Sequence, residues 1–277
     1  MERIKAALDL AREQRDDRYL PDGVVPDRTK PSPHPSEPAS SPEQKIVYTE
    51  TRVLNVSPDH LRRHRVISGP TDPVAAHYSV MRTRVMQAMR ANDWRALVVT
   101  GPNEGAGKTL TAVNLAISMA RETNHSILLV DLDLRRPRIR HYLTEERLPG
   151  LSDYILDNRP IPELLFNPGI DRLVVLPGHH PVIHSAEMLS SAKMVNLVED
   201  ITHRYPSRLV IFDMPPILVA DDVLAFSPYF DAVLLVIGEG DTRRGDLAKA
   251  VELLAKKPLL GTVLNRGAEQ PTGYGYY

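Results

Sequence analysis

Cysteine is absent from the 277 residues of this chain. Without thiols there is no disulfide framework, no thiolate metal site and no cysteine nucleophile, which is typical of a protein from a reducing compartment. An excess of one charge is lacking too, because Lys and Arg number 34 and Asp and Glu number 35. This balance provides no global field toward nucleic acid or an anionic bilayer, so any such contact must be local.

Long hydrophobic runs are also missing. The longest, such as residues 232–237, fall far short of the ~20 apolar residues that cross a bilayer as a helix. The N-terminus, MERIKAALDLAREQRDDR, is too charged for a secretory signal. We therefore expect a cytoplasmic protein without a membrane span. Basic and aromatic residues are not interleaved, so we expect no nucleic-acid partner.

Aromatic residues are few and unevenly distributed. They make up 5% of the chain, yet Tyr274, Tyr276 and Tyr277 occupy three of the last four positions. A terminus this short, led by proline and spaced by glycine, has no core of its own in which to bury these rings. We expect residues 267–277 to form a flexible, tyrosine-rich tail whose tyrosines serve something other than packing.

The composition changes several times before the main domain begins. Residues 1–18 place apolar side chains at helical spacing among charges, which predicts an amphipathic helix, either a docking element or a marginal helix. The proline-rich residues 19–44 predict a disordered linker. Residues 45–71 form a connecting segment with a possible short strand in KIVYTETRVL. The main domain is expected over residues 72–266.

Short apolar segments alternate with helical patterns throughout this domain. The predicted strands are RALVVT, SILLVD, RLVVLP, RLVIFD, DAVLLVI and LLGTVLN. The helical patterns cover about residues 74–90, 107–122, 185–203 and 243–256. Strands that are apolar throughout must be covered on both faces. The sequence therefore predicts an α/β, doubly wound, mainly parallel sheet with helices on both faces, and ligands beyond the carboxyl ends of the strands.

The first strong strand runs into TGPNEGAGKTLTAVNLA, which has the parts of a phosphate-binding loop. Lys108 would hold the β- and γ-phosphates and Thr109 a Mg²⁺ ion. The strict G-x4-G-K-[ST] spacing is not met, because Pro102 stands where the first glycine is expected and the glycine is Gly101. The strand before and the helix after still favour a P-loop NTPase fold. The predicted nucleotide-binding residues are Asn103, Glu104, Gly105, Ala106, Gly107, Lys108, Thr109 and Leu110.

Three aspartates stand at the ends of predicted strands. Asp131 and Asp133 are two residues apart in ILLVDLDLRRPR, so on a strand their side chains would point the same way. Asp213 ends RLVIFD. Any one of them could cap a loop, but three beside a P-loop predict a Mg-ATP site. The candidate catalytic residues are Lys108, Asp131, Asp133 and Asp213.

The segments GPNEGAGKT, LLVDLDLRRP and VIFDMPPIL, in this order, resemble the Walker A, Walker A′ and Walker B motifs of bacterial tyrosine kinases associated with capsule and exopolysaccharide synthesis. The resemblance spans about residues 70–277. It implies an autokinase that transfers the γ-phosphate of ATP to C-terminal tyrosines of a neighbouring subunit. Tyr274, Tyr276 and Tyr277 would then be the phosphate acceptors.

The same resemblance implies roles for single residues. Asp131 would be the base toward the tyrosine hydroxyl. Asp133 and Asp213 would act on Mg²⁺, directly or through water. Asn265 falls where related P-loop ATPases contact the adenine base, although an Asn at a strand end is also an ordinary turn residue.

One motif of the family is eroded here. The family commonly carries E-x2-R-x2-R on the helix before the P-loop, for subunit contact and activation, and the matching positions read Ala76, Ser79 and Arg82. This departure argues against a ring of subunits that assembles through this motif. Arg82 and Arg84 could equally be an ordinary solvated helix face.

The resemblance also implies partners. It suggests a homo-oligomer and a separate transmembrane polysaccharide co-polymerase that activates the kinase and keeps it peripheral to the inner membrane. A cognate tyrosine phosphatase is a further candidate partner.

Two other functions fit parts of the sequence. A deviant-Walker positioning ATPase would share the fold, but such ATPases usually carry a lysine where Asn103 stands and do not need a tyrosine tail. A nucleotide-bound adaptor with little catalysis would suit the eroded arginine motif.

Several polar clusters have ordinary interpretations. His179, His180 and His184 could hold a metal, but lack a matching acid or helical spacing. Asp221 and Asp222 precede VLAF and are expected to cap a helix. A cluster of four arginines could bind nucleotide phosphates or an acidic partner, or could be an ordinary solvated surface. Its members are Arg135, Arg136, Arg138 and Arg140.

Overall fold

The computed structural model describes residues 51–121, 125–205 and 207–267. These residues belong to the compact unit formed by residues 45–277. The predicted N-terminal helix, the proline-rich linker and the three terminal tyrosines lie outside the described residues.

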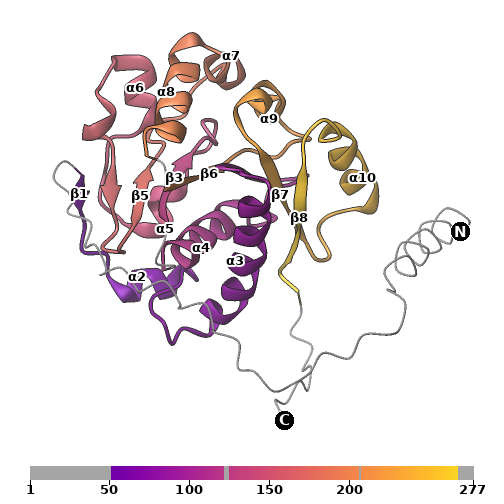
Figure 1. Ribbon diagram of the computed structural model, residues 1–277, viewed down its shortest axis with the longest axis horizontal. Helices are drawn as coiled ribbons and strands as arrows, with labels where there is room; N and C mark the ends of the chain where they lie inside the picture. Colours follow the sequence, from indigo (N-terminus) through magenta and orange to yellow (C-terminus); the bar gives the residue numbers. More distant parts are fainter. Residues whose placement is uncertain (1–50, 122–124, 206, 268–277) are drawn as a thin grey trace, which may run out of the picture. The chain divides into compact units, whose positions relative to one another are not determined.

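A mainly parallel sheet forms the centre of this unit (Figure 1). In the described residues it has eight strands in the order β1-β4-β5-β3-β6-β2-β7-β8, and every pairing is parallel except that of β4 with β5. The strands are β1 (Arg52–Val53), β2 (Ala96–Thr100), β3 (Ser126–Asp131), β4 (Phe166–Asn167), β5 (Leu173–Leu176), β6 (Arg208–Asp213), β7 (Ala232–Gly238) and β8 (Leu259–Asn265). The predicted doubly wound α/β sheet is confirmed.

Helices cover both faces of the sheet (Figure 1). They are α2 (Pro58–Arg63), α3 (Pro73–Ala91), α4 (Lys108–Ala120), α5 (Ile139–Leu143), α6 (Leu151–Asp157), α7 (Ser185–Leu189), α8 (Ala192–His203), α9 (Asp222–Ala225) and α10 (Arg244–Leu253), with short 3₁₀ turns at Ile161–Glu163 and Ser227–Tyr229. Alternate strand residues supply two separate cores: Leu97 and Val99 of β2 pack with α3 and α4, whereas Val98 packs with α8. Strands covered in this way must be apolar at every position, as the sequence indicates.

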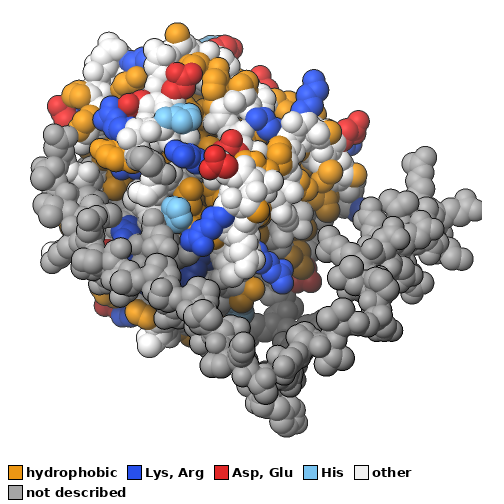
Figure 2. Space-filling view, in the orientation of Figure 1, with side chains coloured by type: hydrophobic (Ala, Val, Ile, Leu, Met, Phe, Trp, Pro, Cys, Tyr) orange, Lys and Arg blue, Asp and Glu red, His pale blue; other side chains and the backbone are white. Residues whose placement is uncertain are grey.

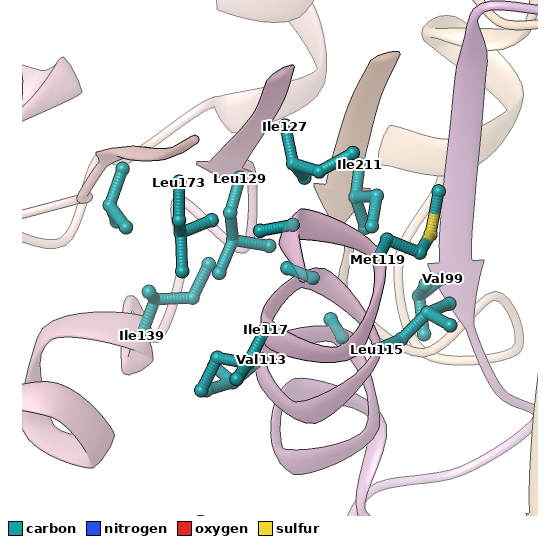
Figure 3. Packing of buried hydrophobic residues seen from close by; sticks show 14 of the residues in the cluster. Val99, Val113, Leu115, Ile117, Met119, Ile127, Leu129, Ile139, Leu173 and Ile211 are labelled. Carbon is teal, nitrogen blue, oxygen red and sulfur yellow. The ribbon is translucent and has the colours of Figure 1, made fainter. Parts of the chain in front are cut away.

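Helix α4 is the centre of the larger core (Figure 3). Val113, Leu115, Ile117 and Met119 are fully buried against strand residues such as Leu129. Because α4 lies between the sheet and α3, it is apolar nearly all round. This packing fixes the start of α4, and with it the loop that precedes it.

The segment before α3 is part of the same core. Leu54, Leu61, Val66 and Ile67 are buried within it, and Asn114 Oδ1 of α4 accepts a hydrogen bond from Ile67 N at 2.9 Å. Helix α3 begins after this segment, where the Asp72 carboxylate caps Val74 N. The described part of the connecting segment is therefore part of the same folded core as α3 and α4.

Two predicted elements differ in the structure. The helical pattern over 185–203 is two helices, α7 and α8, because Ser191 is extended (φ -68°, ψ 149°) and its hydroxyl caps Met194 N. The strand suggested in KIVYTETRVL is confined, in the described residues, to Arg52–Val53. The other predicted strands and helices are present with shifts of a few residues at their ends.

The visible surface carries acidic and basic side chains interspersed with apolar ones (Figure 2). This mixture agrees with the formal net charge of -1. No helix among the described residues is long and apolar enough to cross a membrane.

Candidate functional site

The glycine-rich loop joins β2 to α4 in a backbone shape that two of its glycines permit. Gly105 has φ 79° and Gly107 has φ 91°, which is the left-handed region that side chains disfavour. A Cβ on Gly107 would also lie 2.0 Å from Asn265 Nδ2. The loop ends at the N-terminus of α4, where free backbone N–H groups and the helix dipole favour a phosphate.

Gly101 has a different role, which explains the irregular motif spacing. A Cβ at this position would lie 2.4 Å from the carbonyl oxygen of Val236 on β7. The glycine is thus required by the close approach of a neighbouring strand, and not by a tight turn around a ligand. Pro102 can therefore follow it without loss of the phosphate-binding turn further on.

The loop is held by contacts from distant parts of the chain. Asn265 Nδ2, at the end of β8, donates to Ala106 O at 2.8 Å. Asn103 Nδ2 donates to Asp246 Oδ2 of α10 at 3.0 Å. Ile217 N donates to Gly101 O at 3.0 Å. The predicted nucleotide-binding residues 103–110 all lie in this loop or in the first turn of α4.

Lys108 begins α4 and is 7% exposed. Burial lowers the pKa of its ammonium group, and the charges of Asp213, Asp133 and Glu104 raise it in opposition. The ammonium can donate charge-assisted hydrogen bonds to a phosphate, but the surrounding carboxylates would repel that phosphate unless a cation lies between them.

Asp131 and Asp213 end the neighbouring strands β3 and β6 and face each other in register. They are 0% and 1% exposed. Burial raises the pKa of Asp131 well above its usual range, and the charge of Asp213 adds to this rise. Burial likewise raises the pKa of Asp213 to about 7, with the charge of Asp133 contributing. Two buried acids side by side resist ionisation unless a cation joins them.

Asp133 lies in the loop after β3 and not on the strand itself, because β3 ends at Asp131. Its Oδ1 accepts a hydrogen bond from Arg136 N at 3.0 Å. Its carboxylate is half-buried, and burial raises its pKa, whereas the Arg136 N–H and Lys108 lower it. The expectation that Asp131 and Asp133 share one face of a strand therefore does not apply, yet the loop still brings Asp133 close to Lys108.

The structure thus brings Lys108, Asp131, Asp133 and Asp213 to one place, where their charges act on one another. Several acceptor oxygens there are left over. Both carboxylate oxygens of Asp213 lack a hydrogen-bond partner of normal geometry, and so does Oδ1 of Asp131. These unpaired carboxylate oxygens and the Thr109 hydroxyl beside Asp213 make up an oxygen-only donor set of the kind that Mg²⁺ prefers.

The acids do not by themselves form a closed metal cage. Among the described residues no group of three or more His, Cys, Asp or Glu side chains could hold a metal ion. A magnesium ion here would therefore need ligands from outside the protein, such as nucleotide phosphates and water.

A second network lies beside Asp133, and its acids have a role other than the one that the sequence predicts. Asp222 was expected to cap a helix, but its carboxylate is fully buried and its Oδ2 accepts from Arg135 Nε at 3.2 Å. Arg135 Nε also donates to the buried Ser185 Oγ at 3.0 Å. Asp221 stands at the cap position of α9 without a side-chain cap. The capping interpretation is therefore wrong for both acids, because Asp222 instead balances an arginine from another loop.

The remaining candidates have local partners. Arg136 pairs with Glu104 of the glycine-rich loop at 2.5 Å, in an exposed contact. His179 Nδ1 lies 2.8 Å from Asp153 Oδ2, so this histidine does have a matching acid. Arg82 NH1 donates to Ser118 O of α4 at 3.2 Å, within its own chain. An adenine contact by Asn265 stays a prediction.

The comparisons with known proteins agree with this geometry. A family model described as an AAA domain matches residues 95–238. Tyrosine-protein kinase YwqD of Bacillus subtilis is 32% identical over 222 residues, which cover 78% of this chain and 92% of that protein. The chain belongs to the bacterial tyrosine kinases. It is also 30% identical over 213 residues to a putative tyrosine-protein kinase EpsB of Ralstonia solanacearum, of whose length it spans 28%.

Solved structures of similar proteins show the same fold. The chimerical protein CapA2B2 matches with 26% identity and a TM-score of 0.67, over 79% of this chain and 94% of that one. The VpsO kinase domain matches with 27% identity and a TM-score of 0.64, over 76% and 98%. The cell division ATPase MinD of Pyrococcus furiosus, at 22% identity and a TM-score of 0.54 over 64% and 74%, shares the fold alone. The kinase interpretation of the sequence is thus confirmed, and a positioning ATPase has only the shared fold in its favour.

Proposed function

We propose that this bacterial tyrosine kinase transfers the γ-phosphoryl group of Mg-ATP to Tyr274, Tyr276 and Tyr277 of a neighbouring subunit. The observation that carries the proposal is the meeting of Lys108 with three carboxylates at the N-terminus of α4. Phosphoryl transfer depends mainly on positioning and on neutralisation of charge, and this arrangement supplies both.

The acceptor segment begins near this site. The described chain ends at Gly267, two residues after Asn265, which contacts the glycine-rich loop. Ten further residues of extended chain reach at most about 35 Å. That reach is enough to bring a tyrosine hydroxyl into the site of an adjacent copy.

In the transfer, the tyrosine oxygen forms a bond to the γ-phosphorus and the bond to the β–γ bridging oxygen breaks, so that ADP leaves. The hydroxyl proton passes to the Asp131 carboxylate. Lys108 and the N–H groups of the loop hold the phosphates and offset their charge. When bound, Mg²⁺ supplies further positive charge to the phosphate oxygens, held by Thr109, Asp133 and Asp213 directly or through water.

Burial raises the pKa of Asp131, so this group can act as the base only after it has lost its own proton, and its carboxylate is then a strong proton acceptor. Its Oδ1 is also without a hydrogen-bond partner. Its complete burial requires the bound state to open a path to it, and the half-buried Asp133 is the competing base. Asp131→Asn should therefore lower kcat at an unchanged Mg²⁺ requirement, whereas Asp133→Asn should raise the Mg²⁺ concentration needed for half-maximal rate.

The kinase would regulate the polymerisation and export of capsule or exopolysaccharide. We propose a transmembrane polysaccharide co-polymerase as its activator, which would hold the cytoplasmic kinase at the inner membrane, and a tyrosine phosphatase that reverses the modification. The combination named in the chimerical CapA2B2 supports a two-component arrangement. Because Arg82 is engaged with α4 of its own chain, the homo-oligomer would use contacts other than the usual arginine motif.

A mixing experiment tests the proposal. A Lys108→Met chain, which cannot donate phosphate, is mixed with a Tyr274→Phe/Tyr276→Phe/Tyr277→Phe chain, which cannot accept it. With Mg-ATP and the co-polymerase activator present, phosphotyrosine should appear on the tail of the Lys108→Met chain by mass spectrometry, and neither chain should be modified alone.

Other outcomes would assign a different function. Release of ADP without phosphotyrosine on any wild-type chain would support the positioning ATPase. Nucleotide binding without either product would support the adaptor.

A further inference from the structure

We propose that a basic cavity between α2 and the end of α5 is a binding site for a phosphate-monoester anion. The cavity has a volume of about 280 Å³ and is lined by histidine and arginine side chains from α2, α5 and residues 144–147. It is separate from the glycine-rich loop and from the acids described above.

The charge of the cavity is strongly one-sided. Arg140 and Arg147 contribute two permanent positive charges to its wall. Burial lowers the pKa of Arg140, and the nearby Arg147 lowers it further. Burial likewise lowers the pKa of His141, with contributions from Arg140, Arg138 and His64. Apart from burial, only neighbouring basic groups lower these two pKa values. The basic side chains therefore repel one another, and an anion bound in the cavity would offset this repulsion.

The acid of the cavity does not supply that counter-charge. Glu145 is 76% exposed, and its Oε1 lies 3.5 Å from His60 Nδ1 and 3.7 Å from Arg63 NH2. A carboxylate so exposed is largely screened by solvent. Glu145 therefore offsets little of the positive charge of Arg140 and Arg147 in the cavity.

Donor groups are available to an anion. Arg147 makes no hydrogen bond or ion pair with any residue in the described ranges, so its planar set of N–H donors is free. Arg140 is held in place by its NH1, which donates to Glu146 O at 2.8 Å. Arg140 NH2 also lies 3.2 Å from His141 Nε2, so one anchored and one free guanidinium line the same cavity, and guanidinium groups are well suited to an oxyanion.

The imidazoles form a rigid wall beside these donors. His60 Nε2 lies 3.2 Å from His141 O and His64 Nδ1 lies 3.0 Å from His60 O. Because a carbonyl oxygen only accepts, each of these ring nitrogens carries a proton. The two rings stack with centroids 4.2 Å apart. A metal ion is not favoured here, since it would face two guanidinium groups.

The size of the cavity favours an ester over a bare ion. A volume of about 280 Å³ exceeds that of one phosphate group and leaves room for an attached ring beside the stacked imidazoles. Inorganic phosphate and the phosphotyrosyl group share the recognised chemistry, and the phosphotyrosyl ester adds a ring for the space that a bare phosphate would leave.

Occupancy of this cavity would be felt at the reacting site through α5. The first residue of that helix, Ile139, donates its N–H to Asp131 Oδ2 at 2.9 Å, and the next two residues, Arg140 and His141, line the cavity. An anion that pulls on α5 would therefore shift the support of Asp131. This consequence, unlike the binding itself, rests on the proposed function of Asp131.

Calorimetric titration of the full chain tests the binding independently of kinase activity. The chain is first saturated with Mg-ADP, so that the phosphate-binding loop is already occupied, and is then titrated with phenyl phosphate and, separately, with inorganic phosphate. Saturable binding of phenyl phosphate is expected. Tighter binding of phenyl phosphate than of inorganic phosphate identifies the phosphotyrosyl ester as the ligand, and equal affinity identifies free phosphate.

Variants locate the site. Arg147→Gln should weaken the affinity roughly tenfold or more, because a charge-assisted hydrogen bond is lost, and its side chain has no partner that folding needs. His64→Gln provides a second variant and should also weaken it. The control variant is Arg62→Gln. Arg62 lies on α2 but does not line the cavity, and its side chain pairs with Asp59, so this variant should bind as the wild type does. Absence of saturable heat with both ligands, or equal affinities of Arg147→Gln and the wild type, would overturn the proposal.

Discussion

Asn265 donates a hydrogen bond from Nδ2 to the carbonyl oxygen of Ala106 at 2.8 Å, across 159 positions of the sequence. This contact joins the last strand of the sheet to the phosphate-binding loop. The same amide lies where a Cβ of Gly107 would stand, so the glycine and the asparagine require each other. The shape of the phosphate-binding loop therefore depends on the contact with Asn265 as well as on its own glycines.

Replacement of Asn265 should loosen the loop without removing its ligands. Asn265→Ala leaves the Ala106 carbonyl without its donor, which costs about 1 kcal/mol, and should raise the KM for ATP several-fold with a smaller change in kcat. Thr262→Ala, at an exposed position of the same strand, is the control and should leave the KM unchanged. Steady-state kinetics of tail phosphorylation provide the measurement, and an unchanged KM for Asn265→Ala would remove the supporting role.

The buried acids should make stability depend on pH. Since burial raises the pKa of Asp213 from 3.8 to about 7, the folded state holds a proton there that the unfolded state releases. The contribution of Asp213 to stability therefore falls as pH rises from about 4 to about 7 and is level above that. In EDTA without nucleotide, Asp213→Asn should be more stable than the wild type at pH 8 by at least about 1 kcal/mol, with little difference at pH 4.

Urea unfolding at the two pH values measures this effect. The exposed Asp171→Asn variant, which removes one carboxylate elsewhere, should show no such difference between pH 4 and pH 8. An Asp213→Asn chain less stable than the wild type at pH 8 would mean that the ionised carboxylate is already well solvated or paired.

The Arg135–Asp222 pair should matter more to folding than the neighbouring Arg136–Glu104 pair. Arg135→Met leaves the fully buried Asp222 carboxylate without its donor and should lower the free energy of unfolding by about 2 kcal/mol. Arg136→Met breaks an ion pair whose side chains are 60% and 53% exposed, and should cost less than about 1 kcal/mol. Chemical denaturation of both variants compares them directly. If the Arg136 variant lost as much stability as the Arg135 variant, burial of Asp222 would not be the cause.

The core should respond to truncation as its packing indicates. Leu129→Ala removes a fully buried side chain between β3 and α4 and should lower the free energy of unfolding by about 2–5 kcal/mol. Leu264→Ala, at a position 60% exposed on β8, should change it by less than about 0.5 kcal/mol. Thermal melting of the two variants gives the comparison, and similar midpoints would contradict the assigned core.

Much of the fold is readable from the sequence because its signals are local. Runs such as SILLVD are apolar at every position, and only a strand covered on both faces requires that pattern. The GKT sequence between such a strand and a helix predicts the phosphate-binding turn in the same way. The break between α7 and α8 was missed because Ser191 can be a cap or an ordinary helix residue, and packing selects between the two.

The candidate site could be predicted from the sequence only in part. The sequence supplies Lys108, Asp131, Asp133 and Asp213, since each follows a recognisable strand. It does not connect Arg135 with Asp222, because no periodicity relates residues that meet only when two loops pack together.

The order of residues alone determined the class of fold, the phosphate-binding turn and the acids that face it, because these follow from hydrophobic periodicity and from the few residue types that tolerate a tight turn. Only the tertiary structure decided which acids lose water, which arginine balances Asp222, and that Arg140 and Arg147 share one cavity. Desolvation and pairing arise between segments far apart in the chain, so they exist only once the sheet has brought those segments together.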